Sequence, residues 1–281
     1  MTGANPTDPR DGETGDTGGH ENRSSLASGS LERAAGRLVR DPVTLLPFAI
    51  VGVLLTGIDA LRRRDPIPSV EWATVADRTI HVEYSLYPGP RSHTIRPFVA
   101  LIDLDVPYLL WAVGLELLAT GAMVIAGVVV IRRALAERGV DVPSVRDRVG
   151  AYLGFVVAVD VLARFVGGIG IFRAMPLVIG VPVLIVAAVV GVRLFLVPAS
   201  LVAGRSLPSA IGHSNQLSFG HGWSFLGLIL VFGLGTWLLA SVPAVGTILS
   251  GLVVAPLQAV TLAVVYERVS RGSGETSHAA G

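Results

Sequence analysis

Cysteine and lysine are both missing from this chain of 281 residues, and charged residues make up only 15% of it. Without cysteine, the protein can form neither a disulfide bond nor a thiolate metal site. Arginine supplies the basic charge, and the formal net charge is only +1. A net charge this small gives no indication of a nucleic acid partner.

Apolar residues are abundant instead: 51% of the chain is hydrophobic and the mean hydropathy is +0.64. Several apolar runs are long enough to cross a bilayer, which takes about 20 helical residues. These six runs cover 43–61, 106–131, 149–172, 177–204, 223–241 and 245–265. The sequence therefore predicts an all-α integral membrane protein with six transmembrane helices and the lipid bilayer as its partner.

The two ends of the chain differ from this apolar part. Residues 1–25 are acidic and rich in Gly and Thr, and together with residues 272–281 they are expected to be disordered tails. The transmembrane domain is expected over 26–271. Its first segment, 26–40, has the pattern of an amphipathic helix whose arginines suit lipid headgroups. An ordinary solvated helix would give the same pattern.

Arginines near the ends of the runs predict the orientation. With the N-terminus inside, eleven arginines fall on the inner side and seven on the outer side. The protein is therefore expected in the cell membrane with both termini cytoplasmic. The consecutive arginines Arg62, Arg63 and Arg64 contradict this locally, because they fall on the outer side.

The connector 62–105 is the largest polar segment between runs. Residues 79–87 alternate in type as a half-buried strand does, and a turn follows at Pro88, Gly89 and Pro90. A small external β-hairpin that pairs this run with 94–101 is expected.

A weak internal repeat suggests how the helices are grouped. At an offset of 72, Arg133 matches Arg205, and Gly150 matches Gly222. Each match opens a polar connector that leads into a run, which predicts three helical hairpins with amphipathic interfacial helices before them. Pro182 and Pro198 fall inside the fourth run, so a kink or break is expected near Pro198.

The connector between the fourth and fifth runs carries a family resemblance. From Arg193 to Trp223 it reads RLFLVPASLVAGRSLPSAIGHSNQLSFGHGW. It resembles the membrane domain attached to some glycerophosphodiester phosphodiesterases, which also occurs in six-span bacterial and archaeal families of unknown function. An Ala-Leu-x-x-Ser-like motif of those families corresponds here to Ala210, Ile211 and Ser214, and VVYERV at 264–269 resembles their Tyr-bearing end.

This resemblance implies a membrane protein without enzymatic activity. The phosphodiesterase catalytic domain is a barrel of more than about 200 soluble residues, and the chain has no room for it. The lysine-free, cysteine-free composition with an acidic leader also resembles that of proteins from halophilic archaea.

Charged residues inside the runs are the candidate site, because each costs about 2.5–3.5 kcal/mol to insert. They are Glu116, Asp160, Arg164 and Arg193. Asp160 and Arg164 can pair at i, i+4, while Glu116 is expected to find Arg164 or Arg193 across a helix interface. An ion pair that fixes the bundle is favoured over a carboxylate that relays protons.

A second candidate is the polar segment between the fourth and fifth runs, with His213, Ser214, Asn215 and His221. It is either a polar cytoplasmic site or, as favoured here, an amphipathic helix N-capped near Ser206 on the membrane surface. His81 and His93 alone are weak evidence for a metal site, and no cofactor is expected.

The expected function is that of a membrane protein with a scaffold, regulatory or lipid-interacting role. The alternative is a small secondary transporter or channel that uses the charges of the second to fourth runs. An assembly of several copies is compatible with either function.

Overall fold

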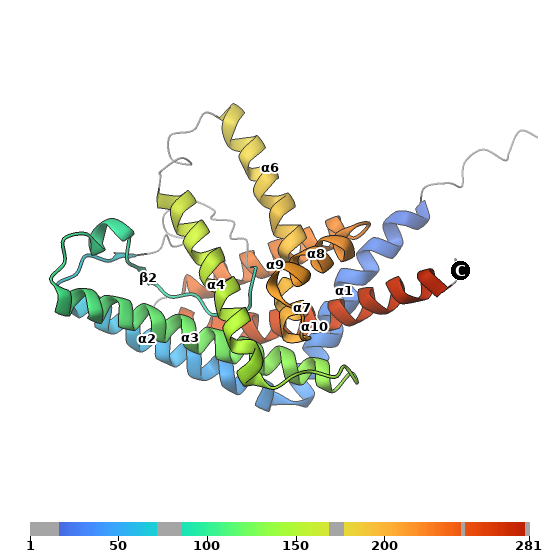
Figure 1. Ribbon diagram of the computed structural model, residues 1–281, viewed down its shortest axis with the longest axis horizontal. Coiled ribbons are helices and arrows are strands. Elements are labelled where there is room, and N and C mark those ends of the chain that lie inside the picture. Colours follow the sequence, from blue (N-terminus) through green and yellow to red (C-terminus); the bar gives the residue numbers. More distant parts are fainter. Residues whose placement is uncertain (1–16, 72–85, 169–176, 243–244, 279–281) are drawn as a thin grey trace, which may run out of the picture.

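A computed structural model describes residues 17–71, 86–168, 177–242 and 245–278, and helices dominate this part of the chain (Figure 1). The elements are α1 (Thr17–Arg40), η1 (Pro42–Leu45), α2 (Leu46–Arg64), β1 (Val70–Glu71), β2 (Thr94–Ile95), η3 (Phe98–Leu101), α3 (Val106–Ala136), α4 (Val145–Gly168), α6 (Leu177–Leu194), α7 (Val197–Val202), α8 (Leu207–Ser218), α9 (Gly222–Ala240) and α10 (Gly246–His278).

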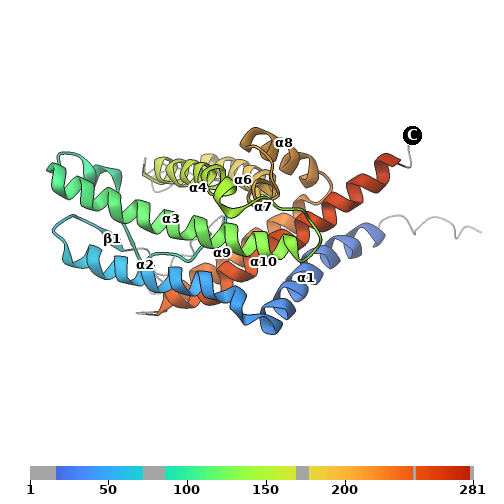
Figure 2. The same ribbon diagram turned by 60° about the horizontal axis from the view of Figure 1, so that its bottom comes forward.

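Helix α10 is the centre of the bundle and packs against α1, α2, α3 and α9 (Figures 1 and 2). Alanine recurs at every fourth position of its buried face, at Ala255, Ala259 and Ala263. Small residues of this kind let helix backbones approach closely in a membrane. The crossing with α2 is equally tight, because a Cβ on Gly52 would lie 3.1 Å from the Cα of Ile248.

Helix α3 packs against both α2 and α4. Helix α4 also packs against α7. Tyr152 of α4 is fully buried beside Gly127 of α3. The sequence predicts that α4 and α6 form a hairpin, but their main partners differ: α6 packs on α8 and α9. In Figure 1 both helices rise away from the layer of α2 and α3.

The break predicted near Pro198 is confirmed, since α6 ends at Leu194 and α7 begins at Val197. Proline has no N–H to donate to the preceding turn, so the helix ends before it. Pro182, in contrast, lies inside α6. Helix α8 begins directly after Ser206, near the position that the sequence predicts, but the Ser206 side chain makes no capping hydrogen bond.

The connector between α2 and α3 folds partly as expected. Residues 79–85 of the predicted strand run lie outside the described residues. Strand β2 pairs antiparallel with β1, with Val70 opposite Ile95, and residues 98–101 form the short helix η3 rather than a strand. The intervening segment enters the bundle, because Pro88 and Pro90 are buried and a Cβ on Gly251 of α10 would lie 3.2 Å from that of Pro90.

Five helical segments of the described residues are long and apolar enough to cross a membrane. They are Pro42–Arg64, Val106–Ala136, Gly180–Val202, Gly222–Ala240 and Gly246–Arg271. These coincide with five of the six predicted runs, so the chain is an all-α, multi-pass membrane protein. Helix α1 begins at Thr17 and helix α10 ends at His278. Each therefore extends into one of the two segments predicted to be disordered tails.

Candidate functional site

Glu116 of α3 joins three helices through its carboxylate. Its Oε1 lies 2.6 Å from Nη2 of Arg62 in α2, and its Oε2 lies 2.9 Å from Nη2 of Arg164 in α4. The Arg62 side chain is only 3% exposed, and the Glu116 side chain is 20% exposed. Of the two cations considered from the sequence, Arg164 is therefore the partner of Glu116, and Arg62 is an additional one.

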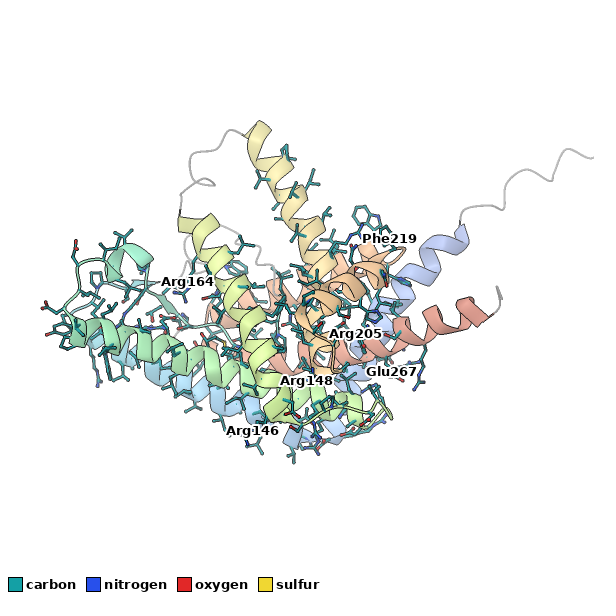
Figure 3. All side chains as sticks on the ribbon, viewed as in Figure 1. Arg146, Arg148, Arg164, Arg205, Phe219 and Glu267 are labelled. Carbon is teal, nitrogen blue, oxygen red and sulfur yellow. The ribbon has the colours of Figure 1, made fainter. Side chains whose placement is uncertain are left out.

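The pair Asp160 and Arg164 lies along one face of α4, as their spacing predicts. Nε of Arg164, which Figure 3 labels on α4, lies 2.8 Å from Oδ2 of Asp160, while the same guanidinium reaches Glu116. The fork of an arginine side chain can hold two carboxylates in this way. Three of the predicted residues, Glu116, Asp160 and Arg164, are thus in one connected network.

Asp59 of α2 is a buried carboxylate that the sequence interpretation missed. It accepts hydrogen bonds from the hydroxyl of Ser92 (2.5 Å), the backbone N–H of His93 (2.8 Å), and both the N–H (3.1 Å) and the hydroxyl (2.6 Å) of Thr94. These donors hold the segment before β2 against the helix. The available signal was Asp59 itself, an acidic residue within the predicted run 43–61.

Arg62 extends the network to the same segment. Its Nη1 donates to the carbonyl of Thr94 at 2.7 Å and to the hydroxyl of Ser92 at 3.0 Å. A buried arginine whose two Nη atoms are bonded in this way is not a free charge in an outer loop. Arg62 therefore counts less against the predicted orientation than its place in the run of Arg62, Arg63 and Arg64 indicated. Arg63 in turn is paired with Glu71 at 3.6 Å.

Arg96 is the other buried arginine in this region and follows β2 directly. Its side chain is inaccessible and pairs with Asp65, just after α2. Asp65 also accepts a hydrogen bond from the indole N–H of Trp111 at 3.2 Å. Arg96 and Asp65 form a separate pair, whereas the network around Glu116 contains two arginines (Arg62 and Arg164) and three carboxylates (Asp59, Glu116 and Asp160).

Arg193 does not belong to this network. It lies near the end of α6, where it bonds the side chain of Asn215 in α8 and covers the ring of Phe219 at 4.2 Å from the centroid. Arg193 and Asn215 were predicted as members of two separate sites. The structure places them together, because α8 folds back onto α6.

Ser214 and Ser218 explain how α8 is held there. The break after α6 leaves backbone groups without their usual helical partners. The hydroxyl of Ser214 donates to the carbonyl of Arg193 (2.6 Å) and accepts from the N–H of Leu196 (3.2 Å). That of Ser218 donates to the carbonyl of Val192 at 3.0 Å. These contacts give α8 a packing role.

The two histidines of this segment have different surroundings. His213 meets the ring of Tyr266 edge to face at 5.9 Å, and burial, followed by the nearby Arg205, lowers the pKa of His213. His221 stacks on Phe225 at 6.1 Å and its Nδ1 lies 3.3 Å from the carbonyl of Phe219.

No three acidic or histidine side chains of the described residues are grouped so that they could hold a metal ion. His81 lies outside those residues, and the backbone of His93 is bound to Asp59. Comparisons with protein-family models, with curated proteins and with solved structures find no match for the chain.

Proposed function

We propose that this chain is a six-span membrane protein without enzymatic activity, with a scaffold or lipid-interacting role, whose intramembrane charges hold its helices together. The observation that carries the proposal is the position of Glu116 between Arg62 and Arg164. Both oxygens of this carboxylate are occupied by arginines from two other helices. A carboxylate bound in this way stabilises a fixed arrangement of helices.

The sixth span in this proposal is α4. It has 24 residues, and the part between Arg148 and Asp160 is free of charged residues. At 1.5 Å per residue α4 is about 36 Å long, which exceeds the roughly 30 Å of the hydrocarbon core. Six spans place both termini on the same side of the cell membrane, which the arginine distribution assigns to the cytoplasm.

The depth of the network supports a structural role. Glu116 precedes Arg132 by about 24 Å along α3, and Arg164 follows Arg148 by about 24 Å along α4. With Arg132 and Arg148 at the inner edge, both charged residues lie in the outer third of the hydrocarbon core. They can therefore pair with the buried segment that precedes β2.

The resemblance to the membrane domain of glycerophosphodiester phosphodiesterases is consistent with this proposal. Ser214, which corresponds to the serine of the family motif, bonds the backbone at the break between α6 and α7. Tyr266 of the Tyr-bearing end packs against His213. Motif residues that make packing contacts support a noncatalytic membrane domain, as a six-span family of haloarchaeal type would have.

The substitution Glu116→Gln tests the structural role. It removes the negative charge that Arg62 and Arg164 share between the helices, so the free energy of unfolding is expected to fall by about 3 kcal/mol. The apparent melting temperature in detergent should then drop by roughly 6–12 °C. Glu71→Gln is the matched control, because Glu71 is 75% exposed and its pair with Arg63 is long; it should change little.

The transporter interpretation is favoured by one observation: nonhelical backbone lies inside the bundle, at Pro88 and Pro90. Within a membrane such backbone is tolerated where it is buried in protein or lines an aqueous cavity. Flux measurements on reconstituted vesicles discriminate the two functions. If Asp160→Asn abolished a flux that the wild type supports, with an unchanged melting temperature, the transporter would replace the structural proposal.

A further inference from the structure

Arg148 and Arg205 are two of the arginines at the inner end of the bundle. Several arginines there are paired with carboxylates: Arg37 with Glu137 at 2.6 Å, Arg138 with Glu267 at 2.8 Å and Arg133 with Asp41 at 3.0 Å. Within the described part of the chain, no carboxylate oxygen lies within 4.0 Å of Arg148 or Arg205. Figure 3 labels both, at the start of α4 and beside α7.

The fold brings these two arginines close to each other and to His213. Arg148 is in the first turn of α4, which packs on α7. Gly204, with φ of 109°, turns the chain after α7, and its missing Cβ would lie 4.0 Å from Nη2 of Arg148. Arg205 follows directly and is near enough to His213 to lower its pKa. Arg148, Arg205 and His213 are called the basic cluster below.

The basic cluster has hydrogen-bond donors to spare. Nε of Arg148 and Nε2 of His213 are buried, and neither has a hydrogen-bond partner among the described residues. The Nε–H of Arg148 is a buried charged donor without a partner, which is costly, and an anion that accepts from it removes that cost. The nearest acid along the chain, Asp147, is occupied by the hydroxyl of Ser144 at 2.7 Å.

The surroundings of the cluster indicate the source of such an anion. Ile211 on α8, Phe219 directly after α8 and Trp223 at the start of α9 are 41%, 64% and 74% exposed. Exposed aliphatic and aromatic side chains on a short amphipathic helix are typical of the boundary between headgroups and acyl chains. The phosphate groups at this boundary are those of lipid headgroups.

We infer that the basic cluster binds the phosphate group of an anionic lipid headgroup, with the two guanidinium groups as donors. Arginine is suited to this ligand because its planar fork matches phosphate oxygens. The inference rests on the proposed function only in that α8 lies at the inner membrane surface. It does not depend on the role of Glu116.

The test measures lipid-dependent stabilisation of the full chain in nanodiscs. Wild type, Arg148→Gln, Arg205→Gln and the control Arg64→Gln are melted in phosphatidylglycerol and in phosphatidylcholine. Arg64 is exposed at the opposite end of the bundle, so its substitution removes the same charge from another surface. The phosphatidylglycerol-dependent rise in melting temperature should be lost in both site variants and kept in Arg64→Gln.

A titration with short-chain phosphatidylglycerol in detergent gives the affinity, which each site substitution should weaken about tenfold. Because each variant is compared with itself in the two lipids, a lower baseline stability does not obscure the result. Arg205→Gln, in a half-exposed connector, serves if Arg148→Gln fails to fold. Equal lipid responses in all four proteins would overturn the inference, as would stabilisation by inorganic phosphate without any response to the lipid.

Discussion

At the scale of single residues, Gly127 and Tyr152 set the distance between α3 and α4. The tyrosine is fully buried, and its hydroxyl occupies the space that a side chain at position 127 would need. A Cβ on Gly127 would lie 2.8 Å from that oxygen, which is shorter than any relaxed contact. The ion pair between Glu116 of α3 and Arg164 of α4 depends on the same close packing of the two helices.

Gly127→Ala is therefore expected to destabilise the protein by about 1–3 kcal/mol, as overpacking of a buried site does. Thermal melting in detergent measures the loss. Gly121→Ala is the matched control on the same helix, because nothing lies within 4 Å of a Cβ there. Adding Tyr152→Phe removes the clashing oxygen and should restore most of the stability; a double variant as unstable as Gly127→Ala would contradict this packing.

The residues of the charge network show what a sequence can and cannot reveal at this scale. The pairing of Asp160 with Arg164 follows from helical spacing alone and is present at 2.8 Å. Arg62 was interpreted as an outer loop cation, yet it is buried against Glu116, 54 positions along the chain. Contacts between residues so far apart depend on tertiary packing, which no local pattern reports.

At the scale of elements, the break between α6 and α7 depends on α8. The sequence predicts the break from Pro198, and it predicts an amphipathic helix after Ser206. It does not predict that the two are joined through the hydroxyls of Ser214 and Ser218. Serine side chains are small and polar, so they can equally well face water or a freed carbonyl.

Ser214→Ala should leave the N–H of Leu196 and the carbonyl of Arg193 without their side-chain partner. The expected loss is about 1–3 kcal/mol, because both groups are withdrawn from water. Hydrogen exchange at the Leu196 amide should accelerate in parallel with the drop in melting temperature. Ser209→Ala, exposed on the same helix, should alter neither measurement, and an unaffected Leu196 amide in Ser214→Ala would refute the role given to this hydroxyl.

At the scale of the whole molecule, the two ends of the bundle carry different charge arrangements. At one end arginines and carboxylates from α1, α10 and the residues after α3 pair with one another, as Arg37 does with Glu137 and Arg138 with Glu267. At the other end the arginines Arg62 and Arg96 are buried. Buried arginines such as these do not contact the aqueous phase. A count that includes them therefore understates the difference in exposed arginines between the two sides, from which the orientation is predicted.

The orientation is tested by cysteine labelling, for which a chain without cysteine gives no background. Ser69→Cys lies beside β1, and Ser144→Cys lies between α3 and α4. A membrane-impermeant maleimide should label Ser69→Cys in intact cells, and Ser144→Cys only after the membrane is permeabilised. Labelling of both from the same side would contradict the six-span arrangement.

The sequence by itself determined that the chain crosses a membrane as helices, because apolar length and the absence of charge are local properties that the bilayer selects directly. It also determined the break near Pro198 and the internal pair of α4. Only the tertiary structure decided that Glu116 lies between Arg62 and Arg164, that Asp59 holds the segment before β2, and that Arg193 belongs with α8. The physical reason is that a charge within an apolar helix must be neutralised, but its partner is chosen by which helices pack together.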